Sequence, residues 1–425
     1  MKILKLTPIA NGVDGLFIEN DRFSTTHISI NLYLPLVKEN IAVNALLPYV
    51  LSSCCADYPD FTALNLKLNQ LYGADVGGIA EKSGDVQVLR FFSFCIDDCF
   101  TPDDTKVVES AFDLLLSMMF SPSVENNGFK EYDVARERRL TLEKIEGLIN
   151  EKRSYAINRT ISEMYKGEPF GEYKAGSYEA VKAINGKTLY SAWKNVLTNA
   201  NVRIQVIGKS LPEGLFEKIG EKFNSFGRTP EKILKTKPKK VPESVNRIEE
   251  KMDVAQGKLV LGFTTDFTGT DNETAFLSVF ADLFGGGPYS KLFANVREKL
   301  SLCYYCAARA NRTKGYLLVD CGVEFENAKK AEKEILHQLD ELRNGNFTDE
   351  ELKTSIRSIK DSLKGLNDSQ SSLDGWYSLK SGETVLSPEE FIEEIEKVKK
   401  EDIIKAASLY KLDTVYSIVP NEKEA

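Results

Sequence analysis

The sequence predicts an α+β protein made of two tandem homologous domains, each an antiparallel sheet with helices packed on one face. Short apolar segments typical of strands are interspersed with longer segments at helical spacing. The order of these segments repeats once, at an offset of more than about 200 residues. A segment rich in proline and lysine separates the two copies.

The first copy opens with strands, continues through helices and closes with a strand. Period-two apolar patterns mark its strands, and three-to-four-residue patterns mark its helices. The expected strands are Gly15–Glu19, His27–Leu34, Ala74–Ala80, Val86–Phe94 and Val202–Ile207. The expected helices are Ile41–Ser53, Phe61–Tyr72, Asp104–Phe120, Gly128–Ile149, Arg153–Tyr165, Tyr178–Ile184, Lys187–Leu197 and Glu213–Phe223.

The second half repeats this order of elements, which favours a tandem duplication over chance. Matching Leu64–Ala80 to Leu292–Ala308 places Gly73 opposite Ser301. The corresponding segments are Asn44–Leu51 with Thr274–Ala281, Leu64–Ala80 with Leu292–Ala308, Asp85–Cys95 with Gly315–Cys321, Tyr178–Tyr190 with Phe391–Ile404, and Val202–Val206 with Val415–Val419.

The segment from Arg228 to Val245 contains three prolines and five lysines. We expect an extended, solvated linker. The predicted domains are therefore 1–227 and 246–425, joined by the linker at 228–245. A basic arm for nucleic acid is the alternative, but the segment lacks aromatic residues and the chain is acidic overall.

Composition narrows the class of protein. The 425 residues suffice for two domains, and the net charge of −8 disfavours nucleic acid as the main partner. The N-terminal residues lack the apolar core of a signal peptide, and no apolar run reaches membrane-spanning length. Seven cysteines, an odd number without a secretory signal, predict reduced thiols in a cytoplasmic protein.

The cysteines are expected to be buried small apolar residues. Cys303 and Cys306 form the one Cys-x-x-Cys motif, on an expected strand. Residues three apart on a strand point to opposite faces, so we expect neither a shared metal nor a redox pair here.

The stretch from Phe284 to Tyr304 organises the second half. Gly285, Gly286 and Gly287 follow an apolar helix, which we expect them to end because glycine turns back without a Cβ penalty. They lack the spacing of a phosphate-binding loop. A new helix should start near Pro288, where proline is well tolerated.

This new helix should present Arg297 near Tyr304. The apolar residues Leu292, Phe293, Val296 and Leu300 fall on one arc that should face a core, with Arg297 at its edge. After Ser301 the period changes to two, so Leu302, Tyr304 and Cys306 should share one face of a strand. Taken alone, this pattern is typical of a snorkelling arginine beside a half-buried tyrosine.

The same stretch resembles the Gly-Gly-Gly-x-x-Ser-x-Leu-Phe-x-x-Val-Arg-Glu-Lys-x-Gly-Leu-Ala-Tyr segment of the pitrilysin/insulinase family, the inverted zincins. It is most similar to the mitochondrial-processing-peptidase-like bacterial branch. The resemblance implies that Arg297 and Tyr304 contact substrate across a chamber from zinc. It also implies substrate-binding roles for Gly285, Gly286, Gly287 and Ser290.

The sequence departs from the family pattern at Ser301, usually glycine, and at Cys303, usually alanine. Neither departure removes the Arg/Tyr pair. In the first half, Asn69 and Val76 occupy the positions that correspond to the pair. The packing of the repeat therefore does not require an arginine and a tyrosine.

The resemblance also locates the zinc ligands of active members. These carry His-x-x-Glu-His on the first helix and a glutamate ligand on a later helix. In this chain the motif positions are Ala45, Pro48 and Tyr49, and the later ligand position falls on Lys144. None of these can bind zinc as an imidazole or act as a carboxylate base, so we expect no metal site in the chain. The two histidines, His27 and His337, are expected to be ordinary surface or boundary residues.

The leading hypothesis is a subunit of a heterodimeric zinc metalloendopeptidase that is inactive alone. A homologous partner would bear His-x-x-Glu-His and hold the zinc, while Arg297 and Tyr304 would stabilise the oxyanion at a shared chamber. The alternative is a scaffold or peptide-binding pseudopeptidase, and some similar proteins are linked to modification of elongation factor P. Self-association stays open.

Overall fold

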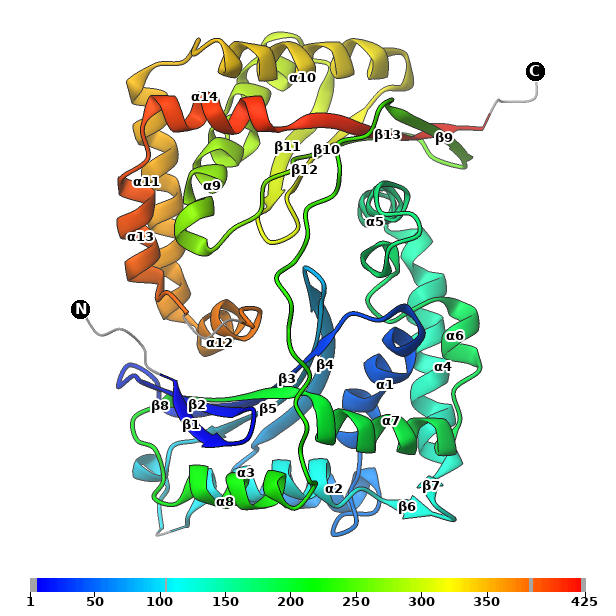
Figure 1. Cartoon of the computed structure of the whole chain (residues 1–425), viewed down its shortest axis with the longest axis vertical. Helices are drawn as coiled ribbons and strands as arrows, with labels where there is room; N and C mark the ends of the chain where they lie inside the picture. The colour runs from blue at the N-terminus through cyan, green and yellow to red at the C-terminus, as the bar shows by residue number, and fades with distance from the viewer. Residues whose placement is uncertain (1–5, 104, 382–384, 422–425) are drawn as a thin grey trace. The chain divides into compact units, whose positions relative to one another are not determined.

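A computed structural model of the chain describes residues 6–103, 105–381 and 385–421. These residues form two compact units, each assembled from segments that are distant in sequence (Figure 1). The first unit contains the described residues of 1–146, 172–235 and 367–385. The second contains those of 147–171, 236–366 and 386–425. Asp104, where one expected helix begins, lies outside the described residues.

The first unit is built on a six-stranded sheet in the order β1-β2-β8-β3-β5-β4. Strand β2 runs parallel to β8, and the other neighbours are antiparallel. The strands are β1 (Thr7–Ala10), β2 (Val13–Glu19), β3 (Thr25–Pro35), β4 (Asp75–Ser83), β5 (Val86–Ile96) and β8 (Asn201–Gly208). The helices are α1 (Ile41–Leu51), α2 (Phe61–Gln70), α3 (Val107–Phe120), α4 (Glu131–Gly147), α6 (Tyr178–Lys182), α7 (Gly186–Asn199), α8 (Leu215–Asn224) and α12 (Gln370–Ser378), beside a small hairpin of β6 (Val124–Glu125) and β7 (Gly128–Phe129).

The two faces of this sheet differ in chemistry because side chains alternate along each strand. On β3, Ile28 and Ile30 enter an apolar core shared with α1, α3 and α7. The intervening residues His27, Ser29 and Asn31 are also buried, but they lie on the face contacted by α12. The sheet therefore has an apolar face and a buried polar face.

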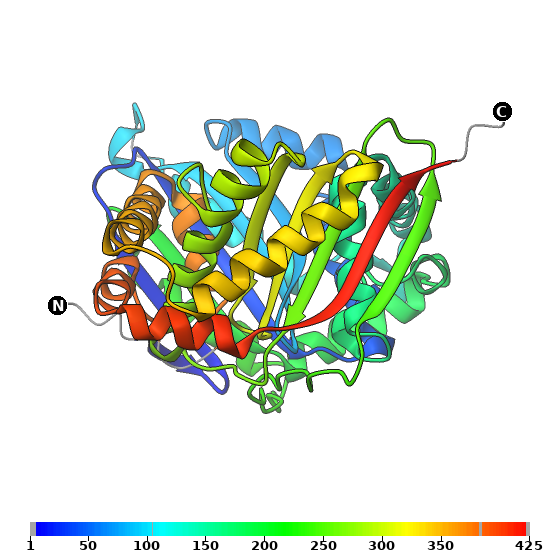
Figure 2. The ribbon, with the colours of Figure 1, turned by 90° about the horizontal axis from the view of Figure 1, so that it is seen from above.

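The second unit is built on a five-stranded sheet in the order β11-β12-β10-β13-β9, with β13 and β9 parallel. Figure 2 shows α9 and α10 lying over one face of this sheet. The strands are β9 (Asn246–Met252), β10 (Gly257–Thr264), β11 (Cys303–Asn311), β12 (Tyr316–Val323) and β13 (Lys411–Pro420). The helices are α5 (Lys152–Met164), α9 (Asp271–Gly285), α10 (Ala328–Arg343), α11 (Asp349–Gly365), α13 (Pro388–Glu396) and α14 (Lys400–Leu409), with a π-helix, η5 (Phe293–Lys299), after α9.

The two sheets confirm the predicted duplication. The order β2-β8-β3-β5-β4 in the first unit matches β9-β13-β10-β12-β11 in the second, and each has its parallel pair at the same edge. The α+β fold of two homologous halves is therefore as predicted. The sheets are antiparallel apart from that one pair.

The units exchange one helix each. Helix α5 follows α4 in the first half of the chain but packs on β10 and β13 of the second unit. Gly262 permits this approach, since a Cβ there would lie 2.3 Å from Met164 Sδ. Helix α12 holds the matching place in the second half and packs on β3 and β8 of the first unit. The sequence predicted two continuous domains, 1–227 and 246–425, without this exchange. That division stays a prediction.

The segment between α8 and β9 contains neither helix nor strand, as expected for a linker. However, Arg228, where the predicted linker starts, is not solvated. Arg228 is buried and donates hydrogen bonds to the carbonyls of Leu197 and Ala200, at the end of α7. Lys239 pairs with the buried carboxylate of Asp413 at 2.5 Å. No helix within the described ranges is long and apolar enough to cross a membrane.

Candidate functional site

The helix that carries Arg297 is wound as a π-helix over Phe293–Lys299. The N–H of Leu300 bonds to the carbonyl of Asn295 at 3.2 Å, five residues back instead of four. This wider turn rotates Leu300 out of the apolar arc, and its exposed fraction is 44%. Leu292 and Val296 are buried as predicted, but the prediction that Leu300 faces the core is wrong.

The turn that follows the π-helix requires an unusual backbone conformation. Ser301 has φ of 49°, in the left-handed region that favours glycine. Gly73, the matching residue of the first half, has φ of 75°. The repeat therefore demands this conformation twice, which explains the glycine that the family usually has at the position of Ser301.

Strand β11 begins with a β-bulge. Cys303 lies opposite Val323, and Tyr305 lies opposite Gly322, so one extra residue is inserted between them. The bulge turns the Tyr304 side chain outward, where it is 61% exposed, whereas Cys306 is buried. The prediction that Tyr304 and Cys306 share a face is wrong for this reason.

Arg297 and Tyr304 both present polar groups to solvent. The Arg297 guanidinium lies 4.6 Å from the centroid of the Phe293 ring, and its Nε is 3.6 Å from Glu298 Oε1. The Tyr304 hydroxyl donates a hydrogen bond of 3.3 Å to Glu324 Oε1. Ion pairs and hydrogen bonds between exposed side chains are weak, so both groups are available to a ligand.

The glycine run ends α9 at Gly285, as expected, but for a different physical reason. None of Gly285, Gly286 and Gly287 has a positive φ. What Gly285 provides is space, since a Cβ there would lie 2.5 Å from the backbone nitrogen of Ala308 on β11. Ser290 is fully buried, and its hydroxyl accepts a 3.4 Å hydrogen bond from the N–H of Phe293.

In the first unit, the positions aligned with zinc ligands lie together. Ala45 and Pro48 are buried on α1, which approaches β4 closely enough that a Cβ on Gly78 would lie 2.4 Å from the Pro48 carbonyl oxygen. Lys144 on α4 places its Nζ 4.9 Å from the centroid of the Tyr49 ring. Burial raises the pKa of the Tyr49 hydroxyl, which keeps the phenol neutral.

Comparison with known proteins identifies the family. The chain is 31% identical over 412 residues to the Bacillus subtilis (strain 168) protein named "Probable inactive metalloprotease YmfF", covering 97% of this chain and 96% of that one. Residues 183–359 match the family description "Peptidase M16 inactive domain". The chain belongs to the M16 peptidase family. This confirms the resemblance to the pitrilysin/insulinase peptidases.

Two further comparisons concern a second relative and the fold. A second Bacillus subtilis (strain 168) relative, "Uncharacterized zinc protease YmxG", is 24% identical over 60% of each chain. The crystal structure of a conserved protein from Enterococcus faecalis V583 covers 99% of both chains with a TM-score of 0.88 at 24% identity, which shows the shared fold.

The residues at the M16 zinc position do not fit a zinc ion. Zinc in proteins is held by imidazole, thiolate or carboxylate groups. Here Ala45 has no donor atom, Tyr49 is a neutral phenol, and the ammonium group of Lys144 would repel a cation. Across the described parts of the chain, no group of three or more His, Cys, Asp or Glu side chains is arranged to hold a metal ion.

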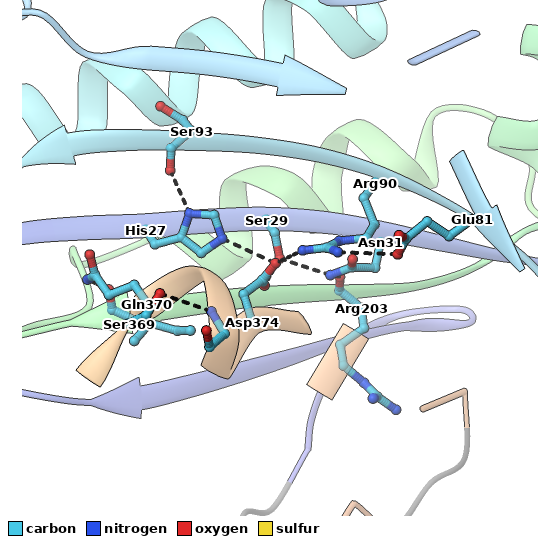
Figure 3. Close-up of polar contacts among 12 residues, drawn as sticks. His27, Ser29, Asn31, Glu81, Arg90, Ser93, Arg203, Ser369, Gln370 and Asp374 are labelled. Carbon is cyan, nitrogen blue, oxygen red and sulfur yellow. Dashed lines mark hydrogen bonds and ion pairs between the residues drawn. The ribbon is translucent and has the colours of Figure 1, made fainter. Parts of the chain in front are cut away.

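A buried polar network in the first unit was not predicted from the sequence. Its centre is the fully buried carboxylate of Asp374 on α12 (Figure 3). Ser29 donates to Asp374 Oδ1 at 2.5 Å, His27 Nε2 lies 3.2 Å from Oδ2, and Arg90 forms an ion pair with the same carboxylate. His27 is 1% exposed, so its assignment as a surface or boundary residue is wrong, whereas His337 is exposed.

The same network secures α12 at its two ends. Gln370 donates from Nε2 to the carbonyls of Thr25 and Ile207, near the start of the helix. Arg203 donates to the carbonyl of Tyr377 in the last turn of the helix and to that of Lys380 just beyond its end. The exchanged helix is thus held by buried polar contacts, which period-two patterning cannot reveal because it marks those strand residues only as non-core.

Ser29, His27 and Asp374 do not form a nucleophilic relay. Both Ser29 and His27 bond to the carboxylate, whereas a relay requires the imidazole to lie between the hydroxyl and the acid. Burial disfavours the Asp374 carboxylate, but the hydrogen bond and charge of His27 and the charge of Arg90 outweigh it and lower its pKa. The network therefore has the chemistry of a structural lock.

Proposed function

We propose that this chain is the zinc-less subunit of a heterodimeric zinc metalloendopeptidase, to which it contributes Arg297 and Tyr304. The observation that carries the proposal is the irregular backbone around these two residues. Arg297 lies within a π-helix, and a β-bulge turns the side chain of Tyr304 outward. Both kinds of irregularity are over-represented at functional sites, where they direct side chains at a cost in regular hydrogen bonding.

The first half of the chain supplies an internal comparison. The matching segment there is a regular α-helix, α2, followed by β4, which pairs with β5 without any register shift. Asn69 and Val76 stand where the second half has the arginine and tyrosine. The duplicated fold is stable with regular geometry at this place, so folding alone does not account for the irregular geometry of the second copy.

Peptide hydrolysis explains why an arginine and a tyrosine would be presented in this way. As water attacks a peptide carbonyl, negative charge develops on the oxygen, and preorganised donors stabilise it. The guanidinium of Arg297 offers several donors in a planar fork, and the Tyr304 hydroxyl offers one more. Gly286 and Gly287 would allow the substrate backbone to approach, with the buried Gly285 and Ser290 supporting the turn.

At the positions that match the zinc ligands the chain has Ala45, Tyr49 and Lys144, so in this proposal a partner supplies the metal-dependent part of the chemistry. The proposed partner is a homologous chain with His-x-x-Glu-His, which would hold zinc and the water-activating glutamate. The naming of one Bacillus subtilis (strain 168) relative as an inactive metalloprotease and another as a zinc protease supports such a division of roles.

The proposal is tested by reconstitution. The chain and a His-x-x-Glu-His relative from the same organism are purified separately, then assayed for complex formation by light scattering and for cleavage of a peptide library. We expect a one-to-one complex and cleavage by the mixture alone. A complex whose activity equals that of the zinc-bearing chain by itself would instead favour the scaffold alternative. Absence of any complex would refute the heterodimer.

A further inference from the structure

The bulge in β11 brings two cysteines to one face of the strand, contrary to the expectation for a regular Cys-x-x-Cys strand. Cys303 lies opposite Val323 and Cys306 lies opposite Cys321, so three steps on β11 match two steps on β12. Two strand residues span about 6.6 Å, which approaches the upper limit of Cα separations in disulfides. Both thiols point into the same buried cluster as Cys321.

The surroundings of the two thiols are unequal. A hydrogen bond from Cys306, and after it the nearby charge of Arg297, lowers the pKa of the Cys303 thiol. The contacts of Cys306 with Cys303 and Cys321, together with burial, raise the pKa of the Cys306 thiol. Cys303 is also the most accessible of the three, at 9% against 5% for Cys306 and 1% for Cys321. These differences are those of an attacking thiol and a resolving thiol.

We propose that Cys303 and Cys306 form a reversible dithiol–disulfide site that is oxidised by hydroperoxides. The Cys303 thiolate attacks the peroxide oxygen and breaks the O–O bond, giving a sulfenic acid and, for hydrogen peroxide, water after protonation. The Cys306 thiol then attacks the Cys303 sulfur, the S–S bond forms, and a second water leaves with the Cys306 proton. Both thiols are oxidised, and the peroxide is reduced.

The site goes beyond the proposed peptidase role and does not depend on a partner chain. Because the separation of the two residues is near the limit for a disulfide, the bond would be strained and readily reversed by a thiol reductant. Tyr304 lies between the two cysteines, so closing the bond would alter the bulge that turns its side chain outward.

Cys99 provides a matched comparison within the chain. It is exposed, but its hydrogen bond with Asp97, followed by slight desolvation and the Asp97 charge, raises the pKa of its thiol. Reactivity governed by exposure would favour Cys99, whereas reactivity governed by thiolate formation would favour Cys303.

The test uses the full chain at pH 7. Under limiting iodoacetamide we expect Cys303 to be alkylated on the order of tenfold faster than Cys99, since thiolate is the reacting form. After hydrogen peroxide, the tryptic peptide Leu300–Arg309 contains both Cys303 and Cys306. It should lose two hydrogen atoms in mass and regain them with dithiothreitol. In Cys306→Ser, dimedone should instead label Cys303 as a sulfenic acid.

Three results would overturn the proposal. Faster alkylation of Cys99 would show that exposure, not thiolate formation, governs reactivity. A cross-link joining Leu300–Arg309 to Gly315–Lys329, the tryptic peptide of Cys321, would assign the disulfide to the directly opposed Cys306–Cys321 pair. An unchanged Leu300–Arg309 mass after peroxide would show that the cluster is inert.

Discussion

Replacing Asp374 by asparagine should release the exchanged helix α12. The corresponding strand positions of the two sheets carry opposite charges, Arg90 on β5 and Asp320 on β12. Arg90 pairs with Asp374 on α12, whereas Asp320 pairs at 2.5 Å with Arg153 on α5. Each exchanged helix therefore carries the charge opposite to that of the strand residue with which it pairs.

The cost of the substitution follows from burial. Breaking a buried ion pair by removing one partner costs about 3–5 kcal/mol, because the other charge is left uncompensated. Asp374→Asn leaves the Arg90 side chain, which is 10% exposed, with Glu81 at 3.5 Å as its remaining acidic neighbour. Since Glu81 compensates part of the charge, we expect a loss of about 3 kcal/mol, near the lower end of that range.

A matched control lies in the other unit. Arg153 is 40% exposed, and Arg309 remains 2.8 Å from Asp320 when Arg153 is removed. Arg153→Gln should therefore cost about 1 kcal/mol or less. Replacing both partners of the buried pair, in Arg90→Met with Asp374→Leu, should recover most of the loss, since neither charge is then left alone.

The assay is urea unfolding followed by tryptophan fluorescence. The chain has two tryptophans, and Trp376 lies on α12, so a Trp193→Phe background reports on this helix. Because the pKa of Asp374 is lowered on folding, its contribution is complete above the ordinary carboxyl value of 3.8 and is lost as the pH falls below it. The reasoning is refuted if Asp374→Asn shifts the Trp376 transition no more than Arg153→Gln does.

Three further predictions follow from the fold. Purified alone, the chain should hold no stoichiometric zinc by metal analysis, and one tightly bound zinc per chain would contradict the conclusion that the residues at the M16 zinc position do not fit zinc. In urea unfolding, Ser301→Gly should stabilise the chain by about 1 kcal/mol, and Gly73→Ala should destabilise it by a similar amount. The reason is the positive φ at both positions, since a Cβ on Gly73 meets nothing within 4 Å. Destabilisation by Ser301→Gly together with stabilisation by Gly73→Ala would rule this out. Limited trypsin should cut first among the exposed lysines of 229–243. The two fragments should co-elute in native buffer, because each one contributes a helix, α5 or α12, to the unit built mainly from the other fragment. Early cuts within 128–165 would show that the linker is misplaced.

Much of the fold was predictable because its signals are local. Apolar periodicity located the strands and helices of the first half closely, and the repeat placed Gly73 opposite Ser301, where both residues adopt a left-handed conformation. The helix exchange was not predictable in this way. It depends on contacts such as Arg90 with Asp374, which are distant in sequence and leave no periodic pattern.

The candidate site was predicted in identity but not in geometry. Arg297 and Tyr304 lie at a helix-to-strand junction, and the glycine run lies between two helices, both as predicted. Regular spacing assumes an α-helix and an unbroken strand, so it could not anticipate the π-turn that exposes Leu300 or the bulge that separates Tyr304 from Cys306. Those irregularities are also what brought Cys303 and Cys306 together, which the alternation rule had excluded.

The most direct test of the donated pair is the turnover of the assembled enzyme with single substitutions in this chain. Arg297→Lys keeps the charge but loses the planar fork, and Tyr304→Phe removes only the hydroxyl. If both groups stabilise the oxyanion, each variant should form the complex normally and reduce kcat by up to about 10² to 10³, with less loss at a more solvated site. The matched first-half variants Asn69→Ala and Val76→Ala should leave kcat nearly unchanged. Arg297 and Tyr304 variants that pair normally and cleave peptide at the unmodified rate would contradict the account.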